Sequence, residues 1–308
     1  NIYQTEERAS LLATENVPNY FLKFIDSQGN IVGQLLVSIR TRFKGNSFRT
    51  KLFKSTPGIK QSACEWSYGP VIFNSNFDSE IYLSLKDFLK SKRFVVNGWT
   101  HPLISTNLEI LKKHFQIKPW GTFLINLEQP IDELYKNLDK HSCRKNIERS
   151  IKRGVIVEQM TDESLSDYYD LINEMRVESG REKGDFEYLV YRWKTFKSLG
   201  YSGFMAKKNN RPVGGLLFSY MNGHIIEIGV ARSKEDRQDN LYSQDLIKWK
   251  IIEWGIKNKM KYYDLTGFNP DPISEKEKGI IKYKKKWGGK PHYYYRILPQ
   301  PNILTGKL

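Results

Sequence analysis

A lysine-rich segment near the end of the chain carries groups that bind anions. The segment KEKGIIKYKKKWGG, residues 276–289, sets lysines around two isoleucines, a tyrosine and a tryptophan. A lysine ammonium is a compact partner for phosphate or for an oxyanion that develops during acyl transfer. In a helix, one face would be largely apolar, with residues at i, i+3, i+4 and i+7: Ile280, Tyr283, Lys284 and Trp287. A solvated surface helix that ends at Gly288 has the same pattern, so this segment predicts either a binding site or an ordinary helix.

Two further side chains have types and positions suited to acid–base chemistry. Asp264, in YYDLTG, ends a predicted strand and would be able to accept a proton from an amine. His101, in GWTHP, occupies the corresponding corner of the first half. Capping a loop or pairing with a nearby charge is the structural alternative for both. The sequence has no Gly-x-Ser-x-Gly motif and no supported Cys/His pair, which argues against a covalent acyl-enzyme.

The composition predicts a globular chain with polyanionic partners. Its 308 residues, 39% of them hydrophobic, suffice for two domains, and a formal net charge of +15 predicts attraction to nucleic acid, an anionic membrane surface or a phosphorylated substrate. Cys64 and Cys143 have no paired spacing, so we expect neither disulfides nor a Cys/His zinc site. With no apolar run near the ~20 residues of a membrane span and no signal-peptide pattern in NIYQTEERAS, a reduced, cytoplasmic setting is favoured.

The two halves carry the same landmarks in the same order. Residues 20–39 and 201–221 each predict a β-hairpin, and both returning strands contain Val-Gly-x-Leu-Leu. Each half continues with a helix, a short strand, a turn with Gly and Pro, a Trp-Gly pair and a closing strand, GTFLINL or HYYYRIL. This order predicts a duplicated α/β unit with mixed sheets flanked by helices, divided into domains at residues 1–150 and 151–308.

A basic helix is predicted at the boundary between the halves. In HSCRKNIERSIKRGVIVEQM it runs from about Ser142 to Arg153, ends at Gly154 and leads into a new strand. Its cations form a stripe that would either contact phosphates or remain a solvated face: Arg144, Lys145, Arg149, Lys152 and Arg153.

Four segments occur in an order found in a known family. They are RKNIERSIKRGVIVE, a hairpin with PVGGLLFSY, the stretch LYSQDLIKWKIIEWGIKNKMKYYDLTGF, and KEKGIIKYKKKWGG. Together they resemble the FemABX family of non-ribosomal peptidyl (aminoacyl) transferases, over roughly the whole chain and most strongly over residues 201–289. The resemblance implies two tandem GNAT-like domains without a cofactor. It also implies transfer of an amino acid from aminoacyl-tRNA to an amino group of a nucleotide- or lipid-linked cell-wall precursor.

The resemblance also assigns roles to residues of this chain. Tyr283 and Lys284 correspond to an aromatic–lysine pair placed against the tRNA end and the reacting carbonyl, so Lys284 is the predicted catalytic cation and Asp264 the candidate proton acceptor. Arg181 and Tyr188, in GREKGDFEY, resemble at a different spacing a pair that grips the precursor diphosphate. The other predicted substrate-binding residues are cations: Lys278, Lys282, Lys285 and Arg232.

Two other functions fit parts of the sequence. An acyl-CoA-dependent GNAT transferase would share the fold, but such enzymes bind the CoA diphosphate with a glycine-rich turn that opens a helix. The second half has Asn240-Leu241-Tyr242-Ser243 where those glycines would lie, and the first half has no such turn either. A non-catalytic RNA-binding protein on a transferase fold would explain the charge. The lysine-rich segment favours an active site over that alternative.

Overall fold

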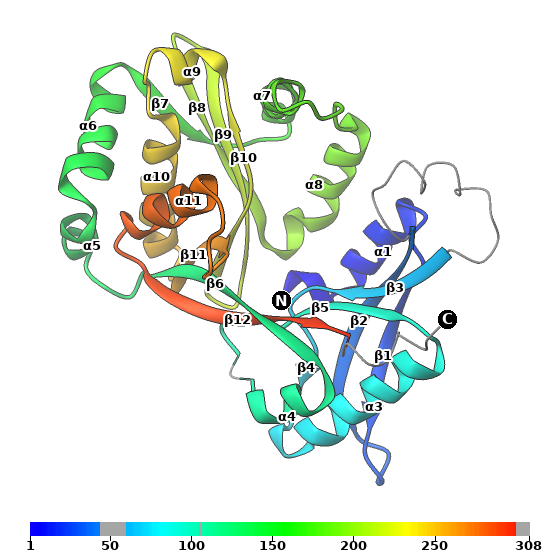
Figure 1. Cartoon of the computed structure of the whole chain (residues 1–308). Coiled ribbons are helices and arrows are strands. Elements are labelled where there is room, and N and C mark those ends of the chain that lie inside the picture. Colours follow the sequence, from blue (N-terminus) through cyan, green and yellow to red (C-terminus); the bar gives the residue numbers. More distant parts are fainter. Residues whose placement is uncertain (44–59, 105, 300–308) are drawn as a thin grey trace. The chain divides into compact units, whose positions relative to one another are not determined.

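The computed structural model describes residues 1–43, 60–104 and 106–299 (Figure 1). The chain divides into two compact units, which are described separately. Unit 1 consists of Asn1–Trp120 with Tyr293–Leu308, and unit 2 consists of Gly121–His292. Among the described residues, no helix is both long and apolar enough to cross a bilayer.

Unit 1 is a mixed sheet with helices. Its strands follow the order β1-β2-β3-β5-β12, and β4 pairs with β2. Strand β3 is antiparallel to β2 and parallel to β5, because helix α3 connects β3 to β5. The bounds are η1 Ile2–Gln4, α1 Glu6–Thr14, β1 Asn19–Ile25, β2 Ile31–Phe43, β3 Lys60–Trp66, β4 Val71–Ile72, η3 Ser75–Phe77, α3 Asp78–Ser91, β5 Val95–Trp99, α4 Leu108–His114 and β12 Lys290–Leu298.

Unit 2 repeats this arrangement. Its strands follow the order β6-β11-β10-β9-β8-β7, with β10 antiparallel to β9 and parallel to β11. Helix α10, which connects β10 to β11, is buried along most of its length in the core of the unit. The bounds are β6 Gln116–Asn126, α5 Ile131–Asn137, η4 Lys140–Arg144, α6 Lys145–Lys152, β7 Val155–Gln159, α7 Ser164–Glu178, α8 Phe186–Gly200, β8 Tyr201–Lys208, β9 Arg211–Met221, β10 His224–Arg232, α9 Lys234–Gln238, α10 Ser243–Lys257, β11 Tyr262–Phe268 and α11 Glu275–Lys285.

The predicted duplication is therefore confirmed as a fold. In each unit an antiparallel hairpin (β1–β2 or β8–β9) is followed by an antiparallel strand, a helix and a parallel strand. The two Val-Gly pairs lie at the start of the second hairpin strand, at Gly33 in β2 and Gly214 in β9. A Cβ added at Gly33 would lie 3.0 Å from Ile81 of α3, and one at Gly214 would lie 2.3 Å from the Ser243 hydroxyl of α10. Both glycines thus let the first turn of the equivalent helix approach the sheet.

The compact units end at other residues than the predicted domains, 1–150 and 151–308. GTFLINL belongs to unit 2, where β6 pairs with β11 in the register Gly121↔Phe268. In unit 1, β12 pairs with β5 in the register Arg296↔Trp99. The predicted boundary helix is α6, and it belongs to unit 2 because Asn146 bonds to Asp245 of α10. Strand pairing, which acts far along the chain, moves the boundaries from residue 150 to residues 120 and 292.

Substituting Gly214 tests this close approach. The Gly214→Ala side chain would overlap Ser243, so we expect a loss of about 1–3 kcal/mol in the free energy of unfolding. Gly279→Ala is the control, because Gly279 lies in helix α11 with nothing within 4 Å of an added Cβ, and it should gain about 0.5–1 kcal/mol. Denaturant unfolding measures both. Equal effects of the two substitutions would contradict the described packing.

Candidate active site

The candidate site is built on an irregularity in strand β11. Thr266 has φ +64°, and the pairing of β11 with β6 shifts register between Asp264 and Gly267. A β-branched residue rarely adopts this left-handed conformation, so the surrounding structure must hold it there. Asp264 does so, because its Oδ1 accepts a hydrogen bond of 2.6 Å from the Thr266 amide. The hydroxyl of Thr122 contacts both Asp264 Oδ1 and, at 2.7 Å, the Thr266 carbonyl oxygen. The bulge is therefore fixed from β6 and from β11 itself.

Lys284 binds the carbonyl oxygens that the bulge presents. Its Nζ donates to Thr266 O at 3.0 Å and to Gly267 O at 2.8 Å. Helix α11 positions it, since a capping box between Ser274 and Glu277 starts that helix. An ammonium has three N–H donors, and among the described residues only these two acceptors are engaged. One donor therefore remains for a ligand oxygen.

Burial weakens the proton affinity of Lys284. Desolvation lowers its pKa from 10.5 to about 8, Glu227 and Asp264 oppose the shift, and Lys248 adds to it. With a pKa of about 8, about nine in ten Lys284 side chains are protonated at pH 7. Lys284 is thus a cation under ordinary conditions, and it loses its charge within one or two pH units of neutrality.

A buried charged cluster lies behind Lys284. The ammonium of Lys248, on α10, pairs with Glu227, on β10, and Tyr263 donates to Glu227 Oε1 at 2.5 Å. Burial, followed by the charge of Glu227, raises the pKa of Tyr263 well above its usual value. The pairing of β10 with β11 ends at Ile226↔Asp264, although both strands continue. Glu227 therefore lies where the two parallel strands stop pairing.

Tyr283 is held from the opposite side by Asp245. Its hydroxyl lies 3.5 Å from Asp245 Oδ1, and Asn146 of α6 donates to Asp245 Oδ2 at 3.1 Å. Burial raises the pKa of Asp245, and burial together with the Asp245 charge raises that of Tyr283 well above its usual value. Tyr283 as a residue is nevertheless 36% exposed. Tyr283, next to Lys284 in the chain, is thus partly open to solvent although its hydroxyl is buried.

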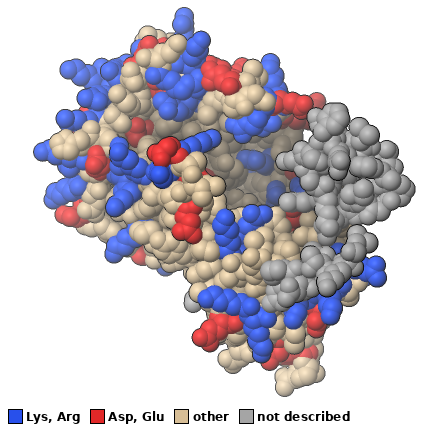
Figure 2. Space-filling model, in the orientation of Figure 1, with Lys and Arg blue, Asp and Glu red and all other residues tan. Residues whose placement is uncertain are grey.

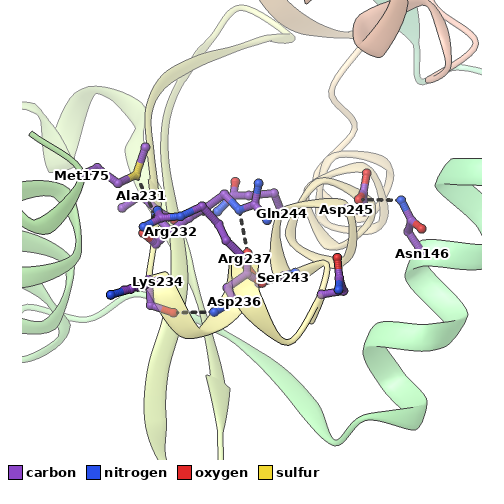
Figure 3. Close-up of polar contacts among 12 residues, drawn as sticks. Asn146, Met175, Ala231, Arg232, Lys234, Asp236, Arg237, Ser243, Gln244 and Asp245 are labelled. Atoms are coloured by element: carbon purple, nitrogen blue, oxygen red, sulfur yellow. Dashed lines mark hydrogen bonds and ion pairs between the residues drawn. The ribbon is translucent and has the colours of Figure 1, made fainter. Parts of the chain in front are cut away.

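The start of α10 holds a carboxylate of the protein itself. Figure 3 shows Arg232, Asp236, Ser243 and Gln244 gathered where β10 passes through α9 to α10. Asp236 is fully buried, accepts from the Ser243 amide at 2.8 Å and accepts from Arg232 Nε at 2.6 Å. Asn240 and Tyr242 have φ of +53° and +57°, so the turn keeps a left-handed backbone without glycine. The first amide of α10, that of Ser243, therefore already donates to the carboxylate of Asp236.

The predicted site residues fall into three groups. Lys284, Asp264 and Tyr283 come together around the bulge and its neighbours. Arg232 instead pairs with Asp236. The exposed lysines follow the outer surface of α11, where Lys278 pairs with Glu275 at 2.8 Å and Lys282 and Lys285 have no described ion pair. That arrangement is compatible with both interpretations of the segment.

Two other expectations concern residues elsewhere. Arg181 lies before α8, where its Nε donates to Ser179, and Tyr188 lies in the first turn of α8. Their role in diphosphate binding stays a prediction. His101 accepts from the Leu103 amide at 3.0 Å, which is the loop-capping alternative.

Sequence reasoning missed the buried charges Glu227, Lys248, Asp236 and Asp245. A signal existed for two of them, because Glu227 and Lys248 interrupt the apolar runs IIEIGVA and LIKWKII. It also missed a polar cavity of about 120 Å³ in unit 1. Arg40 lies in its wall, 3.0 Å from Glu15 and 3.7 Å from Glu65, and other lining residues are Arg8, Asn97, Trp66 and Trp99.

Comparison with solved structures gives the fold a name. FemX superposes with a TM-score of 0.71 at 14% identity, over 98% of this chain and 93% of FemX. The C-terminal domain of a putative lysylphosphatidylglycerol synthetase from Agrobacterium fabrum gives 0.60 at 11% identity, over 96% and 88%. A tandem GNAT protein from the clavulanic acid biosynthesis pathway gives 0.54 at 11% identity, over 94% and 92%. No family model matches the sequence, and no curated protein matches it significantly. The chain therefore has the FemX-like tandem GNAT fold, as the sequence predicted.

Removing the Asp264 carboxylate tests its part in the bulge. Asp264→Ala leaves the Thr266 amide, the Thr122 hydroxyl and His224 without this acceptor, so we expect a loss of about 2–4 kcal/mol in unfolding free energy. Asp271→Ala is the control, because Asp271 is exposed and should change stability by less than about 0.5 kcal/mol. If urea unfolding shows the two variants to be equally stable, Asp264 does not hold the bulge.

Proposed function

We propose that the protein is an aminoacyltransferase that moves an amino acid from aminoacyl-tRNA to an amino group of a cell-wall precursor. The acceptor amine attacks the ester carbonyl carbon, an amide bond forms, and the bond from that carbon to the terminal ribose oxygen breaks. The proton of the amine goes to the departing ribose oxygen. The ester is already activated, so the chain must mainly align the amine and stabilise the oxyanion.

The position of Lys284 is the observation that carries this proposal. A cation held by two backbone carbonyls, with one donor unused among the described contacts, is pre-organised for an oxygen that gains charge. The partly exposed Tyr283 lies next to it in the chain and offers an aromatic ring for the terminal base of the donor. The fold similarity to FemX supports the same class of reaction.

The start of α10 favours tRNA over acyl-CoA as the donor. A CoA diphosphate would need free amides at a helix N-terminus. Asp236 already accepts from the Ser243 amide, so this amide is not available to a diphosphate. The cations on the outside of α11, Lys278, Lys282 and Lys285, would instead contact the phosphates of the tRNA or of the acceptor.

The acceptor and the setting follow from the same reasoning. We assign the acceptor to nucleotide- or lipid-linked precursors, with Arg181 and Tyr188 as the predicted diphosphate-binding residues. An anionic membrane surface is a further partner that the net charge of +15 would favour. Aminoacyl-tRNA as the donor corresponds to a cytoplasmic setting.

Removing the charge of Lys284 tests the catalytic assignment. Lys284→Met should lower the transfer rate at saturating substrate by about tenfold to a thousandfold, because its cation contributes most in the transition state. The Kd for tRNA should change by less than about threefold. Lys276→Met removes a neighbouring exposed lysine of α11 and serves as the control with unchanged rate. The assay uses a pool of charged tRNA with a nucleotide-linked wall precursor.

Two results would contradict the proposal. One is a Lys284→Met variant that transfers as fast as the wild type. The other is tight, saturable binding of CoA or acetyl-CoA in calorimetry, together with no transfer from any aminoacyl-tRNA. That second result would assign the protein to the acyl-CoA-dependent transferases.

The pH dependence provides a further test. Because the pKa of Lys284 is about 8, its cation is present below pH 8 and is lost as the pH rises through that value. The single-turnover transfer rate should therefore fall above about pH 8. The residual activity of Lys284→Arg, whose guanidinium stays charged, or of Lys284→Met should lack this fall. A decline at the same pH in both variants would show that another group causes it.

A further inference from the structure

The basic stripe that the sequence predicted lies on one exposed side of helix α6. Lys145, Arg149 and Lys152 are exposed and follow one another at i, i+4 and i+7, so they share one side of the helix, and Arg153 follows directly. We call these four residues the α6 basic face. Figure 2 shows Lys and Arg gathered over the side of unit 2 where α6 lies in Figure 1. Among the described residues, no carboxylate forms an ion pair with any of the four.

Two of these arginines are ordered by the turn that precedes α10. The guanidinium carbons of Arg149 and Arg153 lie 5.9 and 5.4 Å from the ring centroid of Tyr242, and Arg153 also donates to the Asn240 carbonyl. Tyr242 is half-buried beneath these cations. Guanidinium groups fixed in this way lose less side-chain entropy when a ligand binds.

We propose that the α6 basic face binds consecutive phosphates in one arm of an RNA. This RNA is the aminoacyl-tRNA whose aminoacyl end reaches Lys284, a link that rests on the proposed function. Lys145 and Lys152 are separated by about 10 Å along the helix axis. A nucleic-acid duplex presents one charge per about 1.7 Å of its axis, so several phosphates face a span of this length. Four exposed cations, none of them in an ion pair among the described residues, complement such a row of charges; the one exposed carboxylate of α6, Glu148, accepts from Tyr135.

Contacts within unit 2 connect this face to the candidate active site. Asn146, between the basic residues of α6, bonds to Asp245, and Asp245 lies 3.5 Å from the hydroxyl of Tyr283. The Asp139 amide, just before η4, also donates to the Lys286 carbonyl at 2.8 Å. Helices α6 and α11 are thus held together, so an RNA bound along α6 has a fixed position relative to Lys284.

A membrane surface fits α6 less well. A helix that lies on a bilayer inserts its apolar side. The apolar side of α6 is already buried, with Ile147 2% exposed in the core of unit 2. Ile151 is 58% exposed, but it lies about 160° from Arg149 and about 100° from Lys152 around the helix axis. The exposed cations and the exposed apolar residue therefore do not form one membrane-binding face.

The test compares charge removal on α6 with equal charge removal elsewhere. The triple variant Lys145→Ala, Arg149→Ala, Lys152→Ala should bind uncharged tRNA and a tRNA acceptor-stem minihelix about 10- to 100-fold more weakly at moderate salt. The slope of log affinity against log salt should become shallower by about two to three units. The control triple variant is Lys90→Ala, Lys92→Ala, Lys112→Ala, three exposed lysines of unit 1, and it should leave slope and affinity near those of the wild type. Circular dichroism confirms that both variants are folded.

The outcomes separate this proposal from the proposed function. Loss of RNA binding in the α6 variant supports the RNA surface even if no aminoacyl transfer is found, a combination that would overturn only the proposed function. In the transfer assay the α6 variant should raise KM for aminoacyl-tRNA with little change in kcat. Equal RNA binding and equal salt slopes for the wild type and both variants would overturn the RNA surface. So would α6-dependent binding to anionic phosphatidylglycerol vesicles without α6-dependent RNA binding.

Discussion

The candidate site depends on one interaction, the binding of the Lys284 ammonium by the carbonyl oxygens of Thr266 and Gly267. A buried cation needs acceptors, and a regular strand has few to offer because its carbonyls bond to the neighbouring strands. At the left-handed Thr266 the pairing of β11 with β6 shifts register, and the Thr266 and Gly267 carbonyls accept from Lys284. The contacts of Asp264 and Thr122 are what hold this unfavourable backbone in place. The strained backbone at Thr266, the buried carboxylate of Asp264 and the ammonium of Lys284 therefore depend on one another.

The need to pair buried charges is also met elsewhere in unit 2. Both units join an antiparallel hairpin to a parallel strand through a helix that a glycine lets approach the sheet. In unit 2, α10 brings Lys248 against Glu227 and starts with Ser243 bound to Asp236. These buried charges are paired, as charges in an apolar core must be. The Lys284 ammonium, by contrast, keeps one N–H that no described residue accepts. The candidate site of unit 2 is thus centred on a cation, Lys284.

The sequence predicted those features that lie within short segments. The lysine-rich helix, the hairpins with Val-Gly-x-Leu-Leu and the helix at residues 142–153 each have a local pattern, and the resemblance directed attention to Lys284 and Tyr283. Features that depend on long-range pairing were not predictable. The register of β6 against β11 set the extent of unit 2, and Asp236 reaches the Ser243 amide only once α9 has turned. Tyr242 likewise lies outside α10, in a left-handed conformation and beneath two arginines.

The central claim is that Lys284 faces the oxygen of the reacting ester. The most direct measurement is a crystal structure of the protein with an adenosine-linked phosphonate that mimics the tetrahedral intermediate of aminoacyl transfer. A phosphonate oxygen should lie about 3 Å from Lys284 Nζ, with the adenine against Tyr283. A phosphonate bound at the start of α10, with no oxygen within hydrogen-bond distance of Lys284, would contradict it.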